Sequence, residues 1–299
     1  MSAPPPDTLC IGAAHWDVIA HADAAAMRGD DLPGRVRMAP GGVALNLACA
    51  LAAEGRHPAL LAAIGRDAAG RALARRLRTL GVRDAMLRVS AAPTGAYVAI
   101  EDGGGLVAAV AATGPLDAAG TELLAPLADG RLASADRPWT GAVVVDGNLA
   151  PAALAALAAH PGLAGAPLAV AGASPAKAPA LRALLGREGV AFYLNRAEAE
   201  ALCDAPARST AEACATLLAA GAACAVVTDA ARPAAAATRT PHVIVTAMPP
   251  RVVASRITGA GDAFMAAHLA ALWRGTPAAG ALTHALACAA THITEGPPA

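Results

Sequence analysis

The sequence has few aromatic residues and little charge. Only 2% of its 299 residues are aromatic and 15% are charged, whereas 56% are hydrophobic. This composition excludes a disordered chain, and the length is sufficient for a large buried core. The formal net charge is zero, so no basic excess exists to attract nucleic acid or an anionic membrane. We therefore expect a globular protein that binds neither.

The sequence also lacks paired cysteines, and we expect neither a signal peptide nor a membrane-spanning helix. The six cysteines are scattered, none forms a CxxC pair, and no Cys/His cluster has zinc-ligand spacing. Such single thiols are typical of a reducing cytosol and of small buried apolar side chains. The opening segment MSAPPPDTLC lacks the basic and apolar regions of a signal peptide, and the longest uncharged run, 149–176, is interrupted by proline and glycine. These features predict a cytoplasmic protein.

Two common nucleotide-binding motifs are missing. The sequence contains no GxxxxGK[ST], which excludes a P-loop around phosphates. No GxGxxG follows the first predicted strand, where Gly12-Ala13-Ala14-His15 stands instead. A dinucleotide-dependent oxidoreductase is therefore a weak hypothesis.

Strand and helix signals alternate along most of the chain, which predicts an α/β fold with a mostly parallel sheet covered on both faces. In such sheets ligands bind at the carboxyl ends of the strands. Residues 94–100 and 106–111, separated by EDGGG, instead predict an antiparallel hairpin that could form a small lid. The expected strands are 9–12, 59–64, 142–145, 167–171, 191–194 and 223–228. The expected helices are 42–55, 68–80, 151–159, 177–185, 197–202, 210–220, 261–274 and 276–294.

The most informative segment is Gly259-Ala260-Gly261-Asp262, directly before a predicted helix. Glycines at a helix start expose backbone N–H groups, and these together with the helix dipole favour an anion. Asp262 could be an ordinary first-turn acid, or a base directed at a hydroxyl held beside that anion. Phosphoryl transfer needs both features together.

Three further segments carry polar residues at element ends. Gly41 and Gly42 allow close backbone approach to a ligand, and Asn46 follows on the first helical turn. Asn195 and Glu198 open another helix, where they are typical of capping or of water-mediated magnesium binding. Asp17 follows the first strand and could accept bonds from sugar hydroxyls. Each taken alone is more simply a turn or capping residue.

In this order, the segments resemble the ribokinase-like, or PfkB, family of carbohydrate kinases over nearly the whole chain. ITGAGDAFMAAHLAAL resembles its C-terminal signature, GGVALNLACALAAEG its N-terminal signature and NRAEAEAL its magnesium and phosphate motif. VVTDA resembles the end of its nucleotide-binding strand. The resemblance implies a three-layer α/β sandwich with a central mostly parallel sheet, in one domain spanning 1–299. It also implies a β lid from segments near 13–40 and 92–113, and in many members a homodimer through that lid.

The resemblance also implies roles for individual residues. Asp262 would deprotonate the acceptor hydroxyl of a sugar, and Gly259, Ala260 and Gly261 would form the anion hole. ATP and Mg²⁺ would be the cofactors, with Glu198 acting on the metal through water. The implied sugar ligands are Asp17, Gly41, Gly42 and Asn46, and the implied nucleotide-side residues are Asn195, Glu198, Thr228 and Thr258.

Within the family, PGRVRMAPGGVALN, PTGAYVAIEDGGGLVAAV and VVVDGNL, with Ser174 and Lys177 further on, resemble pseudouridine kinases. Several positions depart from that pattern: Leu45 replaces an arginine, Ala111 and Ala112 replace an Asn or Asp, and Ala171-Gly172 replaces Asp-Pro. Pseudouridine is thus the leading substrate, and another nucleoside or a ribose-like sugar is the alternative.

The sequence also departs from the family pattern in the segments expected to bind the nucleotide phosphates and a monovalent cation. Positions 230 and 233 lack the glycines of a TxGxxG motif, which favours a second hypothesis, a weakly catalytic sensor of the same fold. Arg256-Ile257 replaces residues that often accompany a K⁺ site, so a K⁺ requirement stays open.

Overall fold

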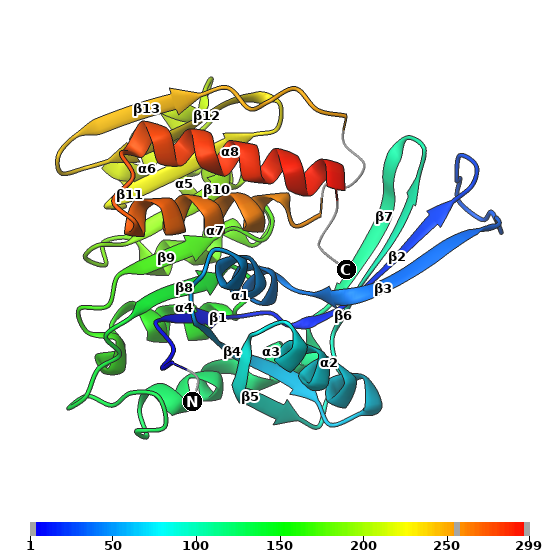
Figure 1. The fold of residues 1–299 in the computed structure, drawn as a ribbon, viewed down its shortest axis with the longest axis horizontal. Coiled ribbons are helices and arrows are strands. Elements are labelled where there is room, and N and C mark those ends of the chain that lie inside the picture. Colours follow the sequence, from blue (N-terminus) through cyan, green and yellow to red (C-terminus); the bar gives the residue numbers. More distant parts are fainter. Residues whose placement is uncertain (1–3, 254–257, 296–299) are drawn as a thin grey trace.

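The computed structural model describes residues 4–253 and 258–295, and its centre is a nine-stranded sheet (Figure 1). Neighbouring strands from β11 to β5 run parallel, whereas β12 and β13 are added antiparallel at one edge. The predicted mostly parallel sheet is therefore confirmed. In spatial order the strands are β13 (Val243–Ala247), β12 (Arg232–Thr238), β11 (Cys224–Asp229), β10 (Ala191–Asn195), β9 (Leu168–Ala171), β8 (Ala142–Asp146), β1 (Thr8–Ile11), β4 (Pro58–Gly65) and β5 (Arg83–Ser90).

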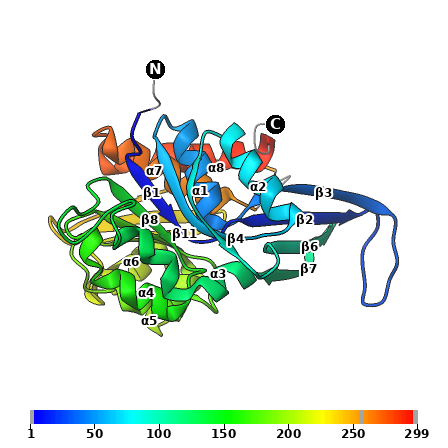
Figure 2. The same cartoon turned by 90° about the horizontal axis from the view of Figure 1, so that it is seen from below.

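Helices cover both faces of this sheet, giving three layers (Figure 2). One face carries α1 (Val43–Ala53), α2 (Ala68–Thr79), α7 (Ala260–Trp273) and α8 (Ala278–Glu295). The other face carries α3 (Gly114–Ala119), α4 (Pro151–Ala158), α5 (Arg196–Cys203) and α6 (Thr210–Ala219). The 3₁₀ helices η1 (Gly120–Leu127), η2 (Pro161–Leu163) and η3 (Ala178–Leu184) contribute to the core on the same face. Within the described residues, no helix is both long and apolar enough to span a bilayer.

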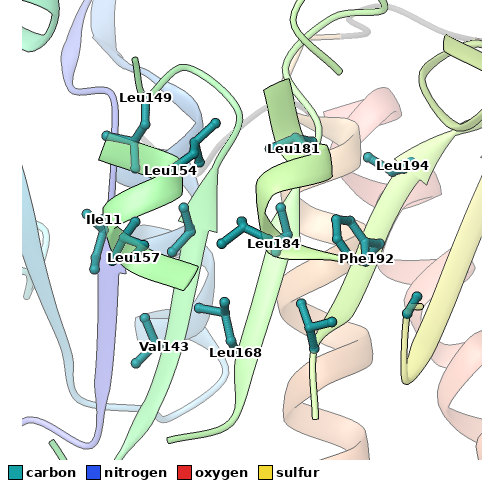
Figure 3. Close-up of a cluster of buried hydrophobic side chains, with 14 of the residues drawn as sticks. Ile11, Val143, Leu149, Leu154, Leu157, Leu168, Leu181, Leu184, Phe192 and Leu194 are labelled. Carbon is teal, nitrogen blue, oxygen red and sulfur yellow. The ribbon is translucent and has the colours of Figure 1, made fainter. Parts of the chain in front are cut away.

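Alternation along the central strands builds two cores from one sheet. Leu9 and Ile11 of β1 face the α4 side, whereas Cys10 between them faces the α1 side. Figure 3 shows the first core, where β-strand residues such as Val143 and Phe192 pack beneath Leu154 of α4 and Leu184 of η3. Burial on both faces explains why these strands appear as continuous apolar runs in the sequence.

A second sheet projects beyond the end of the first (Figures 1 and 2). It has four strands in the order β3 (Gly34–Gly41), β2 (His15–Ala22), β6 (Ala96–Asp102) and β7 (Gly105–Ala112). The predicted hairpin is confirmed as the antiparallel pair β6–β7. Strand β2, which follows β1 in the chain, pairs in parallel with β6 of this hairpin. Segments about 80 residues apart in the sequence therefore form one small sheet, which we call the lid.

Several elements differ from the sequence prediction. Strands β2, β3, β5, β12 and β13 were not among the strands expected from local patterns, although the family resemblance implied a β lid near 13–40. Most residues of β3 and β13 are exposed or half-buried, and β12 is a short buried run of alanines. The helix predicted at 177–185 is instead the 3₁₀ helix η3, with Pro179 in its first turn, where proline is tolerated.

Candidate active site

The start of α1 is held by a buried carboxylate from the end of β8. Asp146 is fully buried, and its Oδ2 accepts hydrogen bonds from the backbone N–H groups of Ala13 (2.8 Å) and Ala44 (2.9 Å). Its Oδ1 accepts a third from Asn148 N–H at 2.8 Å. The N-cap Gly42 has φ 104°, a left-handed conformation that favours glycine. The protein itself thus satisfies the anion-attracting end of this helix.

The start of α7 is different. Its N-cap Gly259 is left-handed, with φ 85°, and no described side chain caps the helix. A Cβ added to Gly261 would meet no described protein atom within 4 Å, and Gly261 is exposed. Neither packing nor backbone conformation therefore requires glycine at 261. The first-turn N–H groups of α7 are available to an external anion.

Asp262 lies in this first turn and is paired with the first turn of α1. Asn46 Nδ2 donates to Asp262 Oδ2 at 2.9 Å, which joins the two signature segments across 216 positions of sequence. Burial raises the pKa of Asp262 to about 7, opposed by the Asn46 hydrogen bond and assisted by the negative charges of three other acids. A carboxylate with this pKa can accept a proton near neutral pH.

The three other acids come from separate elements: Asp17 from β2, Asp146 from β8 and Glu198 from α5. Asp17 is buried, 3.2 Å from His15 Nδ1, and a Cβ on Gly41 would collide with its carboxylate. Gly41 is therefore explained by close packing against Asp17. The fold concentrates negative charge around Asp262.

Asn195 and Glu198 form a reciprocal capping box at the start of α5. Asn195 Oδ1 accepts from Glu198 N–H, and Glu198 Oε2 accepts from Asn195 N–H, both at 2.9 Å. Burial raises the pKa of Glu198, and a Cβ on Gly172 would collide with its carboxylate. A buried acid beside other acids provides hard oxygen ligands whose repulsion a divalent cation would relieve, so this donor set fits Mg²⁺.

Thr228 lies beside Asn195 as its register partner across β10 and β11. The next residue, Asp229, accepts from Arg196 Nε at 2.8 Å and contacts Arg232 at 3.3 Å. Ala230 then adopts φ 49°. The turn thus keeps a left-handed residue where the family motif has glycine, with alanine bearing the strain.

Thr258 is held through its backbone. His292 Nε2 of α8 donates to the Thr258 carbonyl at 3.0 Å, because a carbonyl can only accept. Arg256 and Ile257, the residues relevant to the potassium hypothesis, lie outside the described residues.

The sequence analysis missed two residues of this site. Asp146 lies in the segment VVVDGNL, after an apolar run, but the sequence analysis gave it no role. Tyr97 of β6 is the register partner of Asp17, so the two side chains lie on the same face of the lid. Burial and, after it, the negative charges of Asp17 and Glu101 raise the pKa of Tyr97. Of the departures from the pseudouridine kinase pattern, Leu45 is buried in the core, and Ala111 stands opposite Tyr97 on the same lid face.

Comparison with known proteins gives the family. Residues 6–297 match the model of the pfkB family carbohydrate kinases. None of the curated proteins matches the chain.

Solved structures match over nearly the full length. A carbohydrate kinase from Agrobacterium tumefaciens is 29% identical, with a TM-score of 0.79, over 98% of this chain and 92% of that one. The ribokinase of Arabidopsis thaliana, solved with ribose and ATP, is 20% identical, with a TM-score of 0.78 over 98% and 94%. The adenosine kinase of Sinorhizobium meliloti is 21% identical, with a TM-score of 0.77 over 97% and 94%. The chain belongs to the pfkB family of carbohydrate kinases and has a ribokinase-like fold, and it is a phosphotransferase.

Proposed function

We propose that this protein transfers the γ-phosphoryl group of ATP to the hydroxymethyl group of a nucleoside or ribose-like sugar, with pseudouridine as the leading substrate. The hydrogen bond between Asn46 and Asp262 is the observation that carries this proposal. It fixes an acid of raised pKa beside helix N–H groups that no described side chain caps. Asp262 accepts the proton of the acceptor hydroxyl, while the start of α7 stabilises the charge of the transferred group.

A different set of residues would bind ATP and Mg²⁺. Thr228 and Thr258 approach the nucleotide, and Asn195 and Glu198 orient the phosphates and the water shell of Mg²⁺. The metal would neutralise phosphate charge when bound. The left-handed turn at Ala230 supports an active kinase over a sensor, because the turn geometry persists without the glycine.

Tyr97 supports a nucleoside over a free sugar. Its ring stands on the lid face of Asp17, where it could stack on a base while Asp17, Gly41 and Gly42 hold the sugar. The resemblance of the N-terminal signature and lid hairpin to pseudouridine kinases favours pseudouridine among the nucleosides.

A substrate panel tests the proposal. ADP release from ATP and Mg²⁺ is measured with pseudouridine, uridine, adenosine, inosine, ribose and fructose, with Asp262→Asn as the blank. We expect pseudouridine to give the highest kcat/KM. Tyr97→Ala should raise KM for the preferred nucleoside about tenfold or more, since aromatic stacking contributes about 1–3 kcal/mol per base, and should leave KM for ribose unchanged. Turnover of ribose alone would reject the nucleoside, and ATP binding without any turnover would favour the sensor.

We also propose that two chains associate through the lid. The lid face opposite Asp17 carries Met38, Val98 and Val110 in cross-strand register, with Val36 and Ile100 on the next pairs. These five side chains are 43% to 69% exposed. A contiguous exposed apolar sheet face of this kind is typical of a protein interface, and a second copy would bury it symmetrically.

The mass in solution tests this association. Light scattering should give twice the mass of one chain for the wild type and the mass of one chain for Val98→Asp/Val110→Asp, because the new charges would be buried at the interface. Met248→Glu, which changes an exposed apolar residue outside the lid, is the matched control and should stay dimeric. A monomeric wild type would contradict the proposal.

A further inference from the structure

A second cluster of chemically active side chains lies away from the proposed catalytic site, where the C-terminal end of α1 meets α8. It consists of Glu54, the C-cap residue of α1, and of His284 and Cys288, one helical turn apart on α8. One ligand atom from each of the three side chains lies within 4.8 Å of the others. We propose that this cluster is a binding site for zinc or a similar borderline transition-metal ion.

The geometry matches the ion. Cys288 Sγ and His284 Nε2 are 3.6 Å apart. Two ligands of a tetrahedral zinc ion, at about 2.3 Å for sulfur and about 2.0 Å for nitrogen, are separated by about 3.5 Å. His284 Nε2 also lies 3.7 Å from Glu54 Oε1. Thiolate, imidazole and carboxylate together are zinc ligands, whereas magnesium and calcium prefer oxygen alone.

The neighbouring residues indicate that Oε1 of Glu54 is the oxygen that would bind the metal ion. Arg274 Nη1 donates to Glu54 Oε2 at 3.0 Å, which orients the carboxylate and leaves Oε1 directed at His284. The His284 side chain is 43% exposed, so an ion can enter from solvent and a water molecule can complete the coordination. On binding, the Cys288 thiol releases its proton to solvent and the sulfur donates a lone pair to the metal.

Such an ion would join two helices that flank α7. The first turn of α1 carries Asn46, which holds Asp262, and α7 packs against both α1 and α8. The site would therefore stabilise the helical layer behind the catalytic base without touching substrate. Zinc at a hundredfold excess over its Kd should raise the Tm by about 5 °C.

Cobalt titration of the metal-free full-length protein tests the proposal directly. Excess Mg²⁺ is present to occupy oxygen-ligand sites, and a non-chelating reductant keeps thiols reduced. We expect one Co²⁺ per chain, with the near-ultraviolet absorption of a thiolate–cobalt bond and the visible spectrum of tetrahedral Co²⁺, both removed by added Zn²⁺. Cys288→Ser should abolish the thiolate absorption, and His284→Gln should weaken binding by more than the roughly 10–100-fold typical of losing an outer-shell partner.

Matched variants make the outcome decisive. Cys203→Ser and His242→Gln change a cysteine and a histidine outside the cluster, and both should bind Co²⁺ as the wild type does. Glu54→Gln provides a third ligand variant should either α8 variant fold poorly, and circular dichroism checks each fold. Absence of thiolate absorption in the wild type, or its persistence in Cys288→Ser, would overturn the proposal. Because every readout is metal binding or Tm, the result is independent of the kinase substrate.

Discussion

Asp262→Asn should lower kcat by about 10²–10⁴-fold, the usual contribution of a general base. Asparagine keeps an oxygen to accept from Asn46 Nδ2, so the 2.9 Å contact between α1 and α7 can persist while the proton acceptor is lost. Binding of the acceptor substrate should therefore change little. The measurement is steady-state turnover beside calorimetric binding of substrate and nucleotide. Near-normal turnover would show that Asp262 is not the base.

Gly261→Ala is the companion variant, because it separates the anion hole from the base. An added Cβ meets no described protein atom within 4 Å, so the Tm should stay close to that of the wild type. The methyl group would, however, occupy the space beside the exposed helix N–H groups. Turnover should fall while the Asp262 titration is unchanged.

The raised pKa of Asp262 predicts how both the activity of the wild type and the stability of Asp262→Asn depend on pH. The base works only when ionised, so wild-type kcat/KM should fall about tenfold per pH unit below about pH 7. Stability changes with pH in the opposite direction to activity. The pKa of Asp262 is higher in the folded protein than in the unfolded chain, so the native state loses stability as pH rises from about 4 to 7. Asp262→Asn should therefore be more stable than the wild type at pH 8, with the difference vanishing near pH 4. Equal stability at both pH values would contradict the pKa assignment.

Asp146→Ala should lower the free energy of unfolding by about 3 kcal/mol or more. Three backbone N–H groups, from Ala13, Ala44 and Asn148, lose their acceptor. Each buried donor left without a partner costs about 1–3 kcal/mol, partly offset because a costly buried carboxylate is removed. The loop before β2 and the start of α1 share this carboxylate, so kcat/KM should also fall. Urea unfolding measures the change.

Two variants bracket this result. Asp129→Ala removes an exposed carboxylate paired with Arg131 and should change stability by less than about 0.5 kcal/mol. Asp146→Asn keeps one oxygen and should lie between Asp146→Ala and the wild type. A loss below about 1 kcal/mol for Asp146→Ala would mean that water or a shifted loop satisfies the freed N–H groups.

The parallel sheet and its covering helices were predictable because central strands and amphipathic helices leave local patterns in sequence. The runs at 142–145 and 191–194 are buried on both faces and show this clearly. The lid strands β2 and β3 were not predictable in this way, since β2 also pairs with the distant strand β6 and the outer face of β3 is apolar and exposed. Glycine positions were informative: Gly42 needs a left-handed backbone and Gly41 needs space for Asp17.

By itself the sequence determined the α/β class, the candidate catalytic segment at 259–262 and the family resemblance, because each depends on residues close together in the chain. Tertiary structure alone decided which distant groups act together. Asn46 reaches Asp262 across 216 positions, and three acids from separate elements help to raise the pKa of Asp262. His284 and Cys288 are four residues apart, a local spacing to which the sequence analysis gave no role, and folding brings Glu54 to them. Contacts of this range follow from packing α1, α7 and α8 on one face of the sheet, a property that no local pattern encodes.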